Sequence, residues 1–308
     1  MRAAAAWVLS VASAACLAAY LASTVLTDRV ASMQLAWWIP RAPFALGCVV
    51  LLLAAALAWR RGARARRAYL AMSALAAVFA ALDLDRDFGL PRARPEGGVR
   101  IVQWNTAWTS ERDADTALEA LLSLDADLFV LGDIGHLFRG GGLGRAEALG
   151  YTLRSRGRLS LLSRLPVGEA RILHAAEGAT VSRFAVETSD GPLVIDAFDL
   201  PRDPRRPRYQ AAAQLALDLA RQGPAPDVIV GDFNSTRGSA SVELLLPGGI
   251  EAFAASGTGW GGTYPRYRPW LAIDLLLAKP PWRTVWAKVH DLGARPHRAQ
   301  EVVLRKAG

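Results

Sequence analysis

Three long apolar stretches in the first 84 residues limit most strongly what this chain can fold into. The first, residues 3–26, carries no charged side chain, and two more follow at residues 43–59 and 68–84. Stretches of this length that are apolar on every side are typical of helices that cross a bilayer, whose hydrocarbon core is about 30 Å thick. We therefore predict a membrane domain with three transmembrane helices in residues 1–84 and the lipid bilayer as a partner.

Two alternatives apply to this part of the chain. A positive residue, Arg2, followed by an apolar run is also how a signal peptide begins. Three helices can instead pack into a soluble bundle. None of the three stretches has the polar face that a soluble bundle needs, which favours the membrane.

Arginines between the second and third stretches set the expected orientation. RRGARARR, residues 60–67, holds five arginines, and such loops stay on the cytoplasmic side. Three crossings then place everything after Leu84 outside, whereas two would leave it in the cytoplasm. We predict a multi-pass protein of the cell (inner, cytoplasmic) membrane, with a polar linker at 85–98 and an extracytoplasmic domain at 99–308.

The positive charge of the chain lies mainly in its membrane part. The first 98 residues hold 11 arginines and 5 acidic residues, a net +6 of the total +8, which leaves +2 for residues 99–308. A domain this close to neutral lacks the strong positive field of a dedicated DNA-binding surface. Both cysteines, Cys16 and Cys48, lie in the apolar stretches, so we expect no disulfide partner in the domain.

Residues 99–308 have the pattern of a mixed α/β domain, with many short apolar strands and few helices. Alternation of apolar and polar residues, or a short run of apolar residues, predicts each strand. Leucines and alanines at helical spacing predict the helices. The predicted strands are 99–105, 127–133, 158–164, 179–188, 192–199, 227–234, 271–278 and 300–306, and the predicted helices are 113–126, 207–222 and 239–246.

Several of these strands end, or nearly end, in an acid or an amide. One such residue alone is commonly a turn former or a helix cap. If the strand ends converge in a sheet, they form a cluster that suits Mg²⁺, which is held by a few carboxylates together with substrate phosphate oxygens. The residues are Asn105, Asp133, Asp199, Asp232 and Asn234.

Six short motifs follow one another in a recognisable order: VQWN, VLGD, LSRLPV, VIVGDFNS, GTYP with AIDLLL, and HRAQ. In this order they resemble the endonuclease/exonuclease/phosphatase superfamily, with the deoxyribonuclease I-like fold, over residues 99–308. The resemblance implies a four-layer α/β sandwich of two mixed β-sheets flanked by helices. It also implies an enzyme that hydrolyses phosphate esters with Mg²⁺ or Mn²⁺. The layout further resembles that of membrane-anchored bacterial members.

The resemblance implies a role for each matching residue. Asp232 would act as the general base or orient the attacking water, and His297 would stabilise the transition-state phosphate. Asp274 would orient the histidine or hold a second metal ion. Asn105 would contact the metal or the phosphate, and Asn234 would bind the phosphate.

Three positions depart from the family pattern. Asp133 stands where the family has a metal-binding Glu, Pro296 replaces an Asp, and Asp199 replaces an internal histidine. We hypothesise that Asp199 compensates for the lost acid, either as a metal ligand or by pairing with His297.

The expected function is that of a membrane-anchored, metal-dependent phosphoesterase acting on a phosphodiester or a lipid-linked phosphate outside the membrane. One alternative is an extracytoplasmic nuclease of the same fold with a nucleic acid as its partner. The other is a degenerate, non-catalytic protein that binds a phosphate or a partner.

Overall fold

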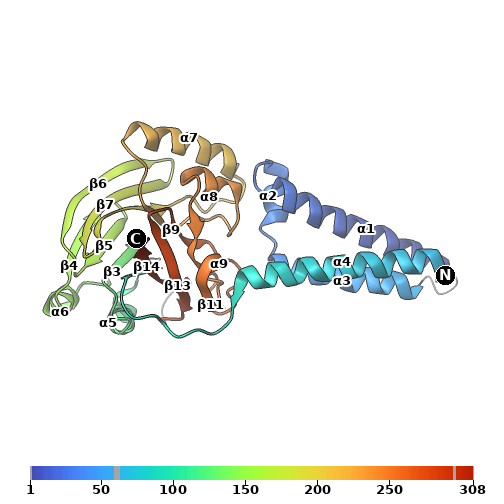
Figure 1. Ribbon diagram of the computed structural model, residues 1–308, viewed down its shortest axis with the longest axis horizontal. Helices are drawn as coiled ribbons and strands as arrows, with labels where there is room; N and C mark the ends of the chain where they lie inside the picture. Colours follow the sequence, from blue (N-terminus) through green and yellow to red (C-terminus); the bar gives the residue numbers. More distant parts are fainter. Residues whose placement is uncertain (1, 59–62, 108, 294–295, 308) are drawn as a thin grey trace. The chain divides into compact units, whose positions relative to one another are not determined.

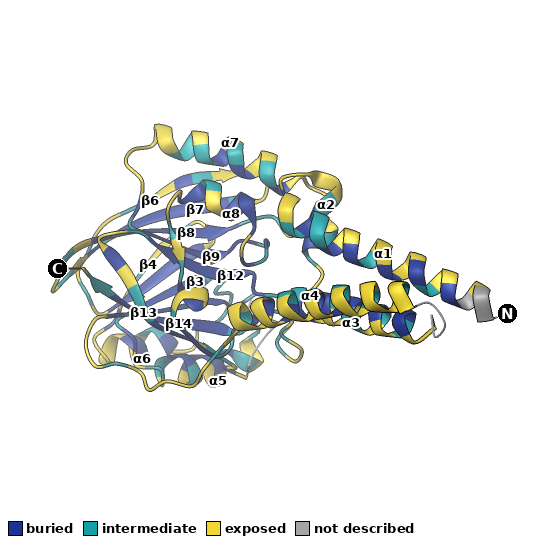
Figure 2. Cartoon of the chain, turned by 45° about the vertical axis from the view of Figure 1, so that its right-hand side comes forward, coloured by how far each residue is buried: buried dark blue, intermediate teal, exposed yellow. Residues whose placement is uncertain are grey.

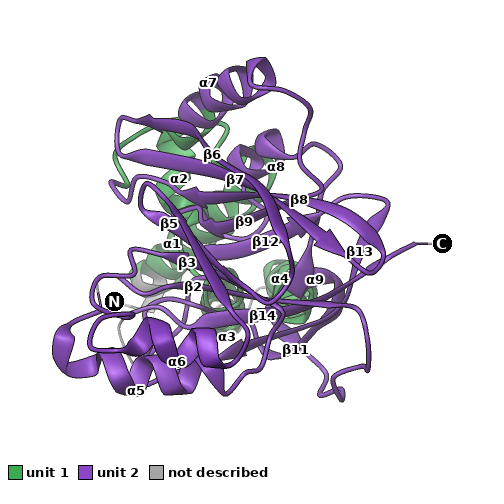
Figure 3. Cartoon of the chain, turned by 90° about the vertical axis from the view of Figure 1, so that its left-hand side faces the viewer, with its two compact units in different colours: residues 1–86, 204–209 green, residues 87–203, 210–308 purple. Residues whose placement is uncertain are grey.

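The computed structural model describes residues 2–58, 63–107, 109–293 and 296–307. The chain divides into two compact units, one of residues 1–86 with 204–209 and one of residues 87–203 with 210–308 (Figure 3). The first unit contains the three predicted apolar stretches, and the second contains the predicted α/β domain.

The first unit is helical, with α1 (Arg2–Leu26), α2 (Ala31–Trp37), α3 (Arg41–Ala58) and α4 (Ala63–Asp87) (Figure 1). Three candidate membrane spans lie in it, at Ala6–Leu26, Arg41–Ala58 and Ala63–Asp87. At 1.5 Å per residue the shortest is about 27 Å long, so the prediction of three helices able to span a membrane is confirmed. Part of the arginine-rich segment, residues 60–62, lies outside the described residues, as does residue 59.

Polar contacts join the helices of this unit. The Tyr20 hydroxyl donates to Asp83 Oδ2 at 2.6 Å, and the guanidinium of Arg41 lies 4.2 Å from the centre of the Tyr20 ring. The sulfur atoms of Cys16 and Cys48 are 3.0 Å apart, and both cysteines are free thiols.

The second unit contains two mixed β-sheets. Each combines antiparallel pairs with parallel ones, such as β2 with β3 and β8 with β9. The eight-stranded sheet has the order β1 (Phe88–Gly89), β11 (Gly257–Trp260), β13 (Trp282–His290), β14 (Ala299–Lys306), β2 (Val99–Asn105), β3 (Leu128–Gly132), β5 (Leu159–Ser163) and β4 (Thr152–Arg156). The six-stranded sheet has the order β10 (Ile250–Glu251), β12 (Asp274–Ala278), β9 (Val228–Asp232), β8 (Gly191–Asp199), β7 (Ala179–Thr188) and β6 (Val167–Ala176).

Helices cover the outer faces of the two sheets. Helices α5 (Glu111–Leu122) and α6 (Gly142–Ala148) pack on the eight-stranded sheet, and α7 (Arg208–Arg221) and α8 (Ala240–Leu245) on the six-stranded one. The core between the sheets is made of side chains such as Val130, Ile195 and Val302. Figure 2 shows the buried strands between the helical layers. The predicted four-layer sandwich is confirmed.

Several elements differ from the sequence prediction. Strands β4 and β6 were not predicted, because most of their residues are exposed or half-buried and they lack a clean apolar alternation. The predicted strand 271–278 begins only at Asp274. The short helix α9 (Ala252–Ser256) was also missed.

The segment 85–98, predicted as a linker, differs as well. Its first three residues end α4, and Phe88–Gly89 form β1, which pairs with β11. Further on, the backbone N–H of Arg92 donates to Thr258 Oγ1, and Arg94 pairs with the buried Glu301. This segment is therefore fastened to the α/β unit rather than free.

Candidate active site

Three aspartates lie side by side at one edge of the six-stranded sheet. Asp199 ends β8, Asp232 ends β9 and Asp274 begins β12. The register pairs Asp232 with Asp199 on one side and with Asp274 on the other. Because β8 and β9 run parallel and β12 runs antiparallel to them, all three carboxylates reach the same edge.

A glycine lets two of these strands approach each other. Gly231, in the GDFN motif, has φ of +143°, and a Cβ added there would lie 2.0 Å from the carbonyl oxygen of Phe198. Any larger residue would push β9 away from β8 and separate Asp232 from Asp199. The glycine of GDFN therefore serves the spacing of the carboxylates.

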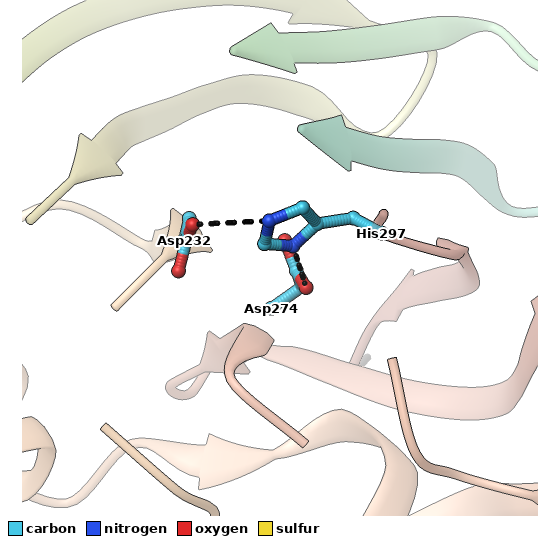
Figure 4. Close-up of side chains that lie close together, drawn as sticks. All are labelled: Asp232, Asp274 and His297. Carbon is cyan, nitrogen blue, oxygen red and sulfur yellow. Dashed lines mark hydrogen bonds and ion pairs between the residues drawn. The ribbon is translucent and has the colours of Figure 1, made fainter. Parts of the chain in front are cut away.

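The imidazole of His297 lies between two of the carboxylates (Figure 4). Its Nδ1 is 2.9 Å from Asp274 Oδ2, and its Nε2 is 3.9 Å from Asp232 Oδ2. The indole N–H of Trp104 donates to the carbonyl of His297 at 3.2 Å. The VQWN motif thus helps to hold the histidine in place from the other sheet.

Amide side chains from β2 complete this group. Asn105 Nδ2 donates to Asp232 Oδ2 at 2.8 Å, while the backbone N–H of Ala107 donates to Asn105 Oδ1. Gln103, two residues earlier on the same face of the strand, donates to Asp274 Oδ1 at 3.1 Å. Sequence analysis missed Gln103, although its period-two spacing from Asn105 is a signal that can find it.

Burial and mutual charge shift the pKa values of these groups. Burial, followed by repulsion from Asp274, raises the pKa of Asp232 to about 7. Burial alone would lower the pKa of His297, but the carboxylate of Asp274 more than offsets it and raises that pKa to about 9. Burial raises the pKa of Asp199 to about 6 against the attraction of Arg158. At neutral pH the histidine is therefore an imidazolium among carboxylates.

Asn234 lies beside this group but uses its amide inside the protein. Its Nδ2 donates to the carbonyl of Leu200 at 2.8 Å, and its backbone N–H donates to Asp232 Oδ1 at 2.9 Å. Its φ is +46°, a left-handed conformation that Asn tolerates better than most residues. Asn234 thus shapes the turn that orients Asp232.

Asp133 and Asp199 share a partner that sequence analysis missed. Arg158 forms a bidentate pair with Asp133, from Nε to Oδ1 at 2.9 Å and from Nη2 to Oδ2 at 2.6 Å. Its Nη2 also lies 3.0 Å from Asp199 Oδ2. Among the described residues, the ion-pair partners of His297 are Asp274 and Asp232, whereas Asp199 acts on the histidine only through its charge. The predicted pairing of Asp199 with His297 stays a prediction.

A pocket opens next to these side chains. Both sheets contribute to its lining, which includes Asn105, Gly132, Leu159, Asp199 and Asp232. The carboxylates and amides therefore face a space that a substrate atom or a water can enter.

The donor set is compatible with a divalent cation. Asp232 and Asp274 each offer a carboxylate oxygen, and these oxygens lie within 4.8 Å of each other and of a ring nitrogen of His297, which is protonated and therefore not itself a ligand. Among the described residues, four carboxylates, counting Asp133 and Asp199, have two cationic partners, Arg158 and His297. Within the described part of the chain, Gln103 Oε1 is buried without a hydrogen bond, and Asp199 Oδ2 has its ion pair with Arg158 but no hydrogen bond. Oxygen ligands with surplus negative charge suit a hard cation such as Mg²⁺.

Fold and site together define a four-layer α/β sandwich with carboxylates, amides and a histidine gathered at the ends of its central strands. The model of the Endonuclease/Exonuclease/phosphatase family matches residues 102–296, and the chain belongs to this family. Members are hydrolases that act on phosphate esters, and they generally depend on a divalent metal ion. No curated protein sequence matches the chain.

Solved structures share the fold at low sequence identity. The human Nocturnin catalytic domain with bound sulfate is 16% identical, with a TM-score of 0.54, and the match covers 68% of this chain and 93% of that one. A mannosyl-6-phosphatase of Bacteroides thetaiotaomicron is 14% identical, with a TM-score of 0.53 and coverages of 68% and 100%. D. rerio TDP2 complexed with a single-strand DNA product is 14% identical, with a TM-score of 0.51 and coverages of 68% and 100%.

Proposed function

We propose that this protein is a membrane-anchored, divalent-metal-dependent phosphoesterase that hydrolyses a phosphodiester or a lipid-linked phosphate at the outer side of the membrane. The observation that carries the proposal is the imidazole of His297 between Asp232 and Asp274, beside a pocket in a domain of this family. Three helices long enough to span a membrane support the anchor.

The residues would divide the chemistry among them. Asp232 takes the proton of the attacking water as the general base. His297, held by Asp274 through Nδ1, directs Nε2 at the charge that develops on the phosphate. Asn105 and Asn234 orient Asp232 through the bonds that they make to its two oxygens. The phosphate-binding role predicted for these amides stays a prediction.

Asp274 and Asn105, from the ligand set predicted by the sequence, would hold Mg²⁺ or Mn²⁺ together with Asp232. A bound divalent cation supplies positive charge at the non-bridging phosphate oxygens and lowers the pKa of a bound water. Asp133 remains a predicted ligand as well, although both its oxygens are paired with Arg158.

The outer orientation rests on the arginines of residues 60–67. A positive loop between the second and third spans stays in the cytoplasm, so an odd number of spans leads the chain outward. A catalytic domain tethered there would meet phospholipid head groups and lipid-linked phosphates at high local concentration.

The test is hydrolysis of bis-(p-nitrophenyl) phosphate by the purified full chain in detergent micelles, first with chelator and then with Mg²⁺ or Mn²⁺. We expect metal-dependent turnover that falls at least about 10²-fold in Asp232→Asn and in His297→Ala, the typical size of an acid–base or electrostatic contribution. Asp190→Asn, in an exposed turn, is the matched control and should keep full activity.

Turnover that persists in Asp232→Asn would contradict the assigned roles. A folded protein that neither turns over nor binds a divalent cation would point instead to the degenerate, phosphate-binding alternative.

A nuclease is the second candidate, because D. rerio TDP2 with its single-strand DNA product shares this fold. Hydrolysis of a labelled single-stranded oligonucleotide and of a phospholipid vesicle, measured in parallel, distinguishes the nuclease from the lipid-directed phosphoesterase. Cleavage of the oligonucleotide alone would favour the nuclease.

A further inference from the structure

Arg158 is a cation placed at the site by two buried carboxylates. It lies in the turn between β4 and β5 and pairs with Asp133 through two parallel hydrogen bonds. The same guanidinium reaches Asp199 at 3.0 Å. A guanidinium gripped at one edge by a carboxylate has a fixed plane and direction.

The backbone fastens this arrangement. The N–H of Asp133 donates to the carbonyl of Arg158 at 3.0 Å, so the loop after β3 and the turn before β5 are joined at the same two residues that form the ion pair. Asp133 has φ of +46°, which turns the chain away from β3 immediately after the strand. The pair is therefore held by backbone as well as by side chains.

Part of the guanidinium remains open to a ligand. The side chain of Arg158 is 45% exposed, whereas those of Asp133 and Asp199 are each 9% exposed. Its Nη1 makes no hydrogen bond to any residue that the structure describes. The next residue, Leu159, lines the pocket together with Asn105, Asp199 and Asp232. Because Nη2 lies 3.0 Å from Asp199, the guanidinium is adjacent to the pocket lining.

We propose that Arg158 is a phosphate anchor, whose Nη1 binds a non-bridging oxygen of the substrate while Asp133 and Asp199 position it. The inference rests on the proposed function in one respect, that the ligand is a phosphate ester. A guanidinium donates to phosphate through a rigid fork, so it orients the group as well as attracting it. The anchor adds a permanent positive charge next to Asp199, a residue of the pocket lining.

This assignment changes the role predicted for Asp133. A carboxylate with both oxygens engaged by an arginine acts through that arginine, and it is a positioning residue for as long as the pair is intact. Asp133 then acts on the phosphate through Arg158, and its oxygens become available to a cation only when that pair opens.

The test uses the full chain in detergent micelles with inorganic phosphate as the probe, measured by calorimetry. Arg158→Gln should weaken phosphate binding roughly 10- to 100-fold, the loss expected for a hydrogen bond to a charged group. With bis-(p-nitrophenyl) phosphate it should raise KM more than it lowers kcat. Arg154→Gln, an exposed arginine on the preceding strand, removes the same charge from the same hairpin and should change neither value.

A double variant separates anchoring from simple charge neutralisation. If Arg158 only neutralises Asp133, adding Asp133→Asn to Arg158→Gln should restore phosphate affinity. We expect the double variant to stay as weak as Arg158→Gln, and Arg158→Lys to recover only part of the affinity because an ammonium lacks the fork. Restored affinity in the double variant, or unchanged affinity in Arg158→Gln, would overturn the proposal.

The outcome is independent of whether the wild type is an enzyme. If the wild type binds phosphate but does not turn over, the proposed function fails while the loss of binding in Arg158→Gln still supports the anchor. If the wild type turns over and Arg158→Gln keeps its KM and its phosphate affinity, only the anchor fails.

Discussion

Two buried carboxylate–cation pairs in the α/β unit differ in how completely they are closed. Arg183 and Asp196 face each other on β7 and β8 and share two hydrogen bonds, of 2.7 and 2.8 Å, with side chains only 6% and 1% exposed. His297 and Asp274 share one bond, and the second ring nitrogen of His297 points to another carboxylate, Asp232, 3.9 Å away.

The difference shows what each pair contributes. In the closed pair each carboxylate oxygen meets a guanidinium N–H, so the two charges satisfy each other. In the open pair the carboxylates outnumber the cation, and burial together with their mutual repulsion raises the pKa of Asp232. Polar groups that stabilise a fold have all their hydrogen bonds and ion pairs made within the protein. Groups that act on a substrate have some of this capacity left for the substrate.

Opening the closed pair should have the largest effect on stability. Asp196→Asn leaves the Arg183 charge buried with half its bonds, which costs about 3–5 kcal/mol of unfolding free energy. We expect this loss in urea unfolding of the micellar protein followed by tryptophan fluorescence, with turnover per folded molecule unchanged.

Asp218→Asn, in an exposed pair on α7, is the control for Asp196→Asn and should lose less than about 1 kcal/mol. A change of similar size in both variants would show that the closed pair contributes no more than a surface pair.

Breaking the open pair should lower turnover strongly and stability only slightly. Asp274→Asn removes the partner that orients His297, so turnover should fall about 10- to 100-fold. Its unfolding free energy should change by less than about 1 kcal/mol, because losing one of two neighbouring carboxylates also relieves repulsion. The same two measurements apply. A strong loss of stability with normal turnover would reverse the comparison.

The smallest effect is expected at Glu301, a buried carboxylate of the other sheet with three partners. Burial raises its pKa, but hydrogen bonding to His290 and the charges of Arg94 and Arg100 more than offset this, so the pKa lies below 4.5. The folded state therefore holds this proton less tightly than the unfolded chain. Its contribution to stability is complete above about pH 4.5 and is lost as pH falls through the folded-state pKa.

Glu301→Gln should lower stability at neutral pH by on the order of 1 kcal/mol, the size of a single hydrogen bond. The stability of this variant should also fall less steeply than that of the wild type between about pH 5 and pH 3, an interval around the ordinary glutamate pKa of 4.5. Parallel curves for the two proteins over that interval would count against the role of this carboxylate.

Sequence patterns predicted the main elements and part of the site. The apolar stretches predicted three long helices. The predicted strand-end residues Asn105, Asp199 and Asp232 do lie close together, because neighbouring strands with apolar runs of matched length end together. His297 was assigned through the resemblance, since nothing in its local sequence marks it.

Other features of the fold and the site were not predicted, because they depend on contacts between distant segments. Arg158 is one of many arginines in the chain, and its local pattern is that of an ordinary hairpin turn. Its pairing with Asp133 and Asp199 exists only where β5 lies beside β3 and faces β8 across the two sheets. Exposed strands such as β4 lack a core-facing pattern and were missed for the same reason.

The sequence by itself determined the division into a part with three helices able to span a membrane and an α/β domain, because hydrophobic length and periodicity act locally along the chain. It also determined which residue types were available for phosphate chemistry. Tertiary structure alone decided the electrostatics: which carboxylate faces His297, which is bound to Arg158, and which oxygens stay without a partner. Charge interactions depend on distances and burial in three dimensions, and those quantities are set only when the two sheets pack together.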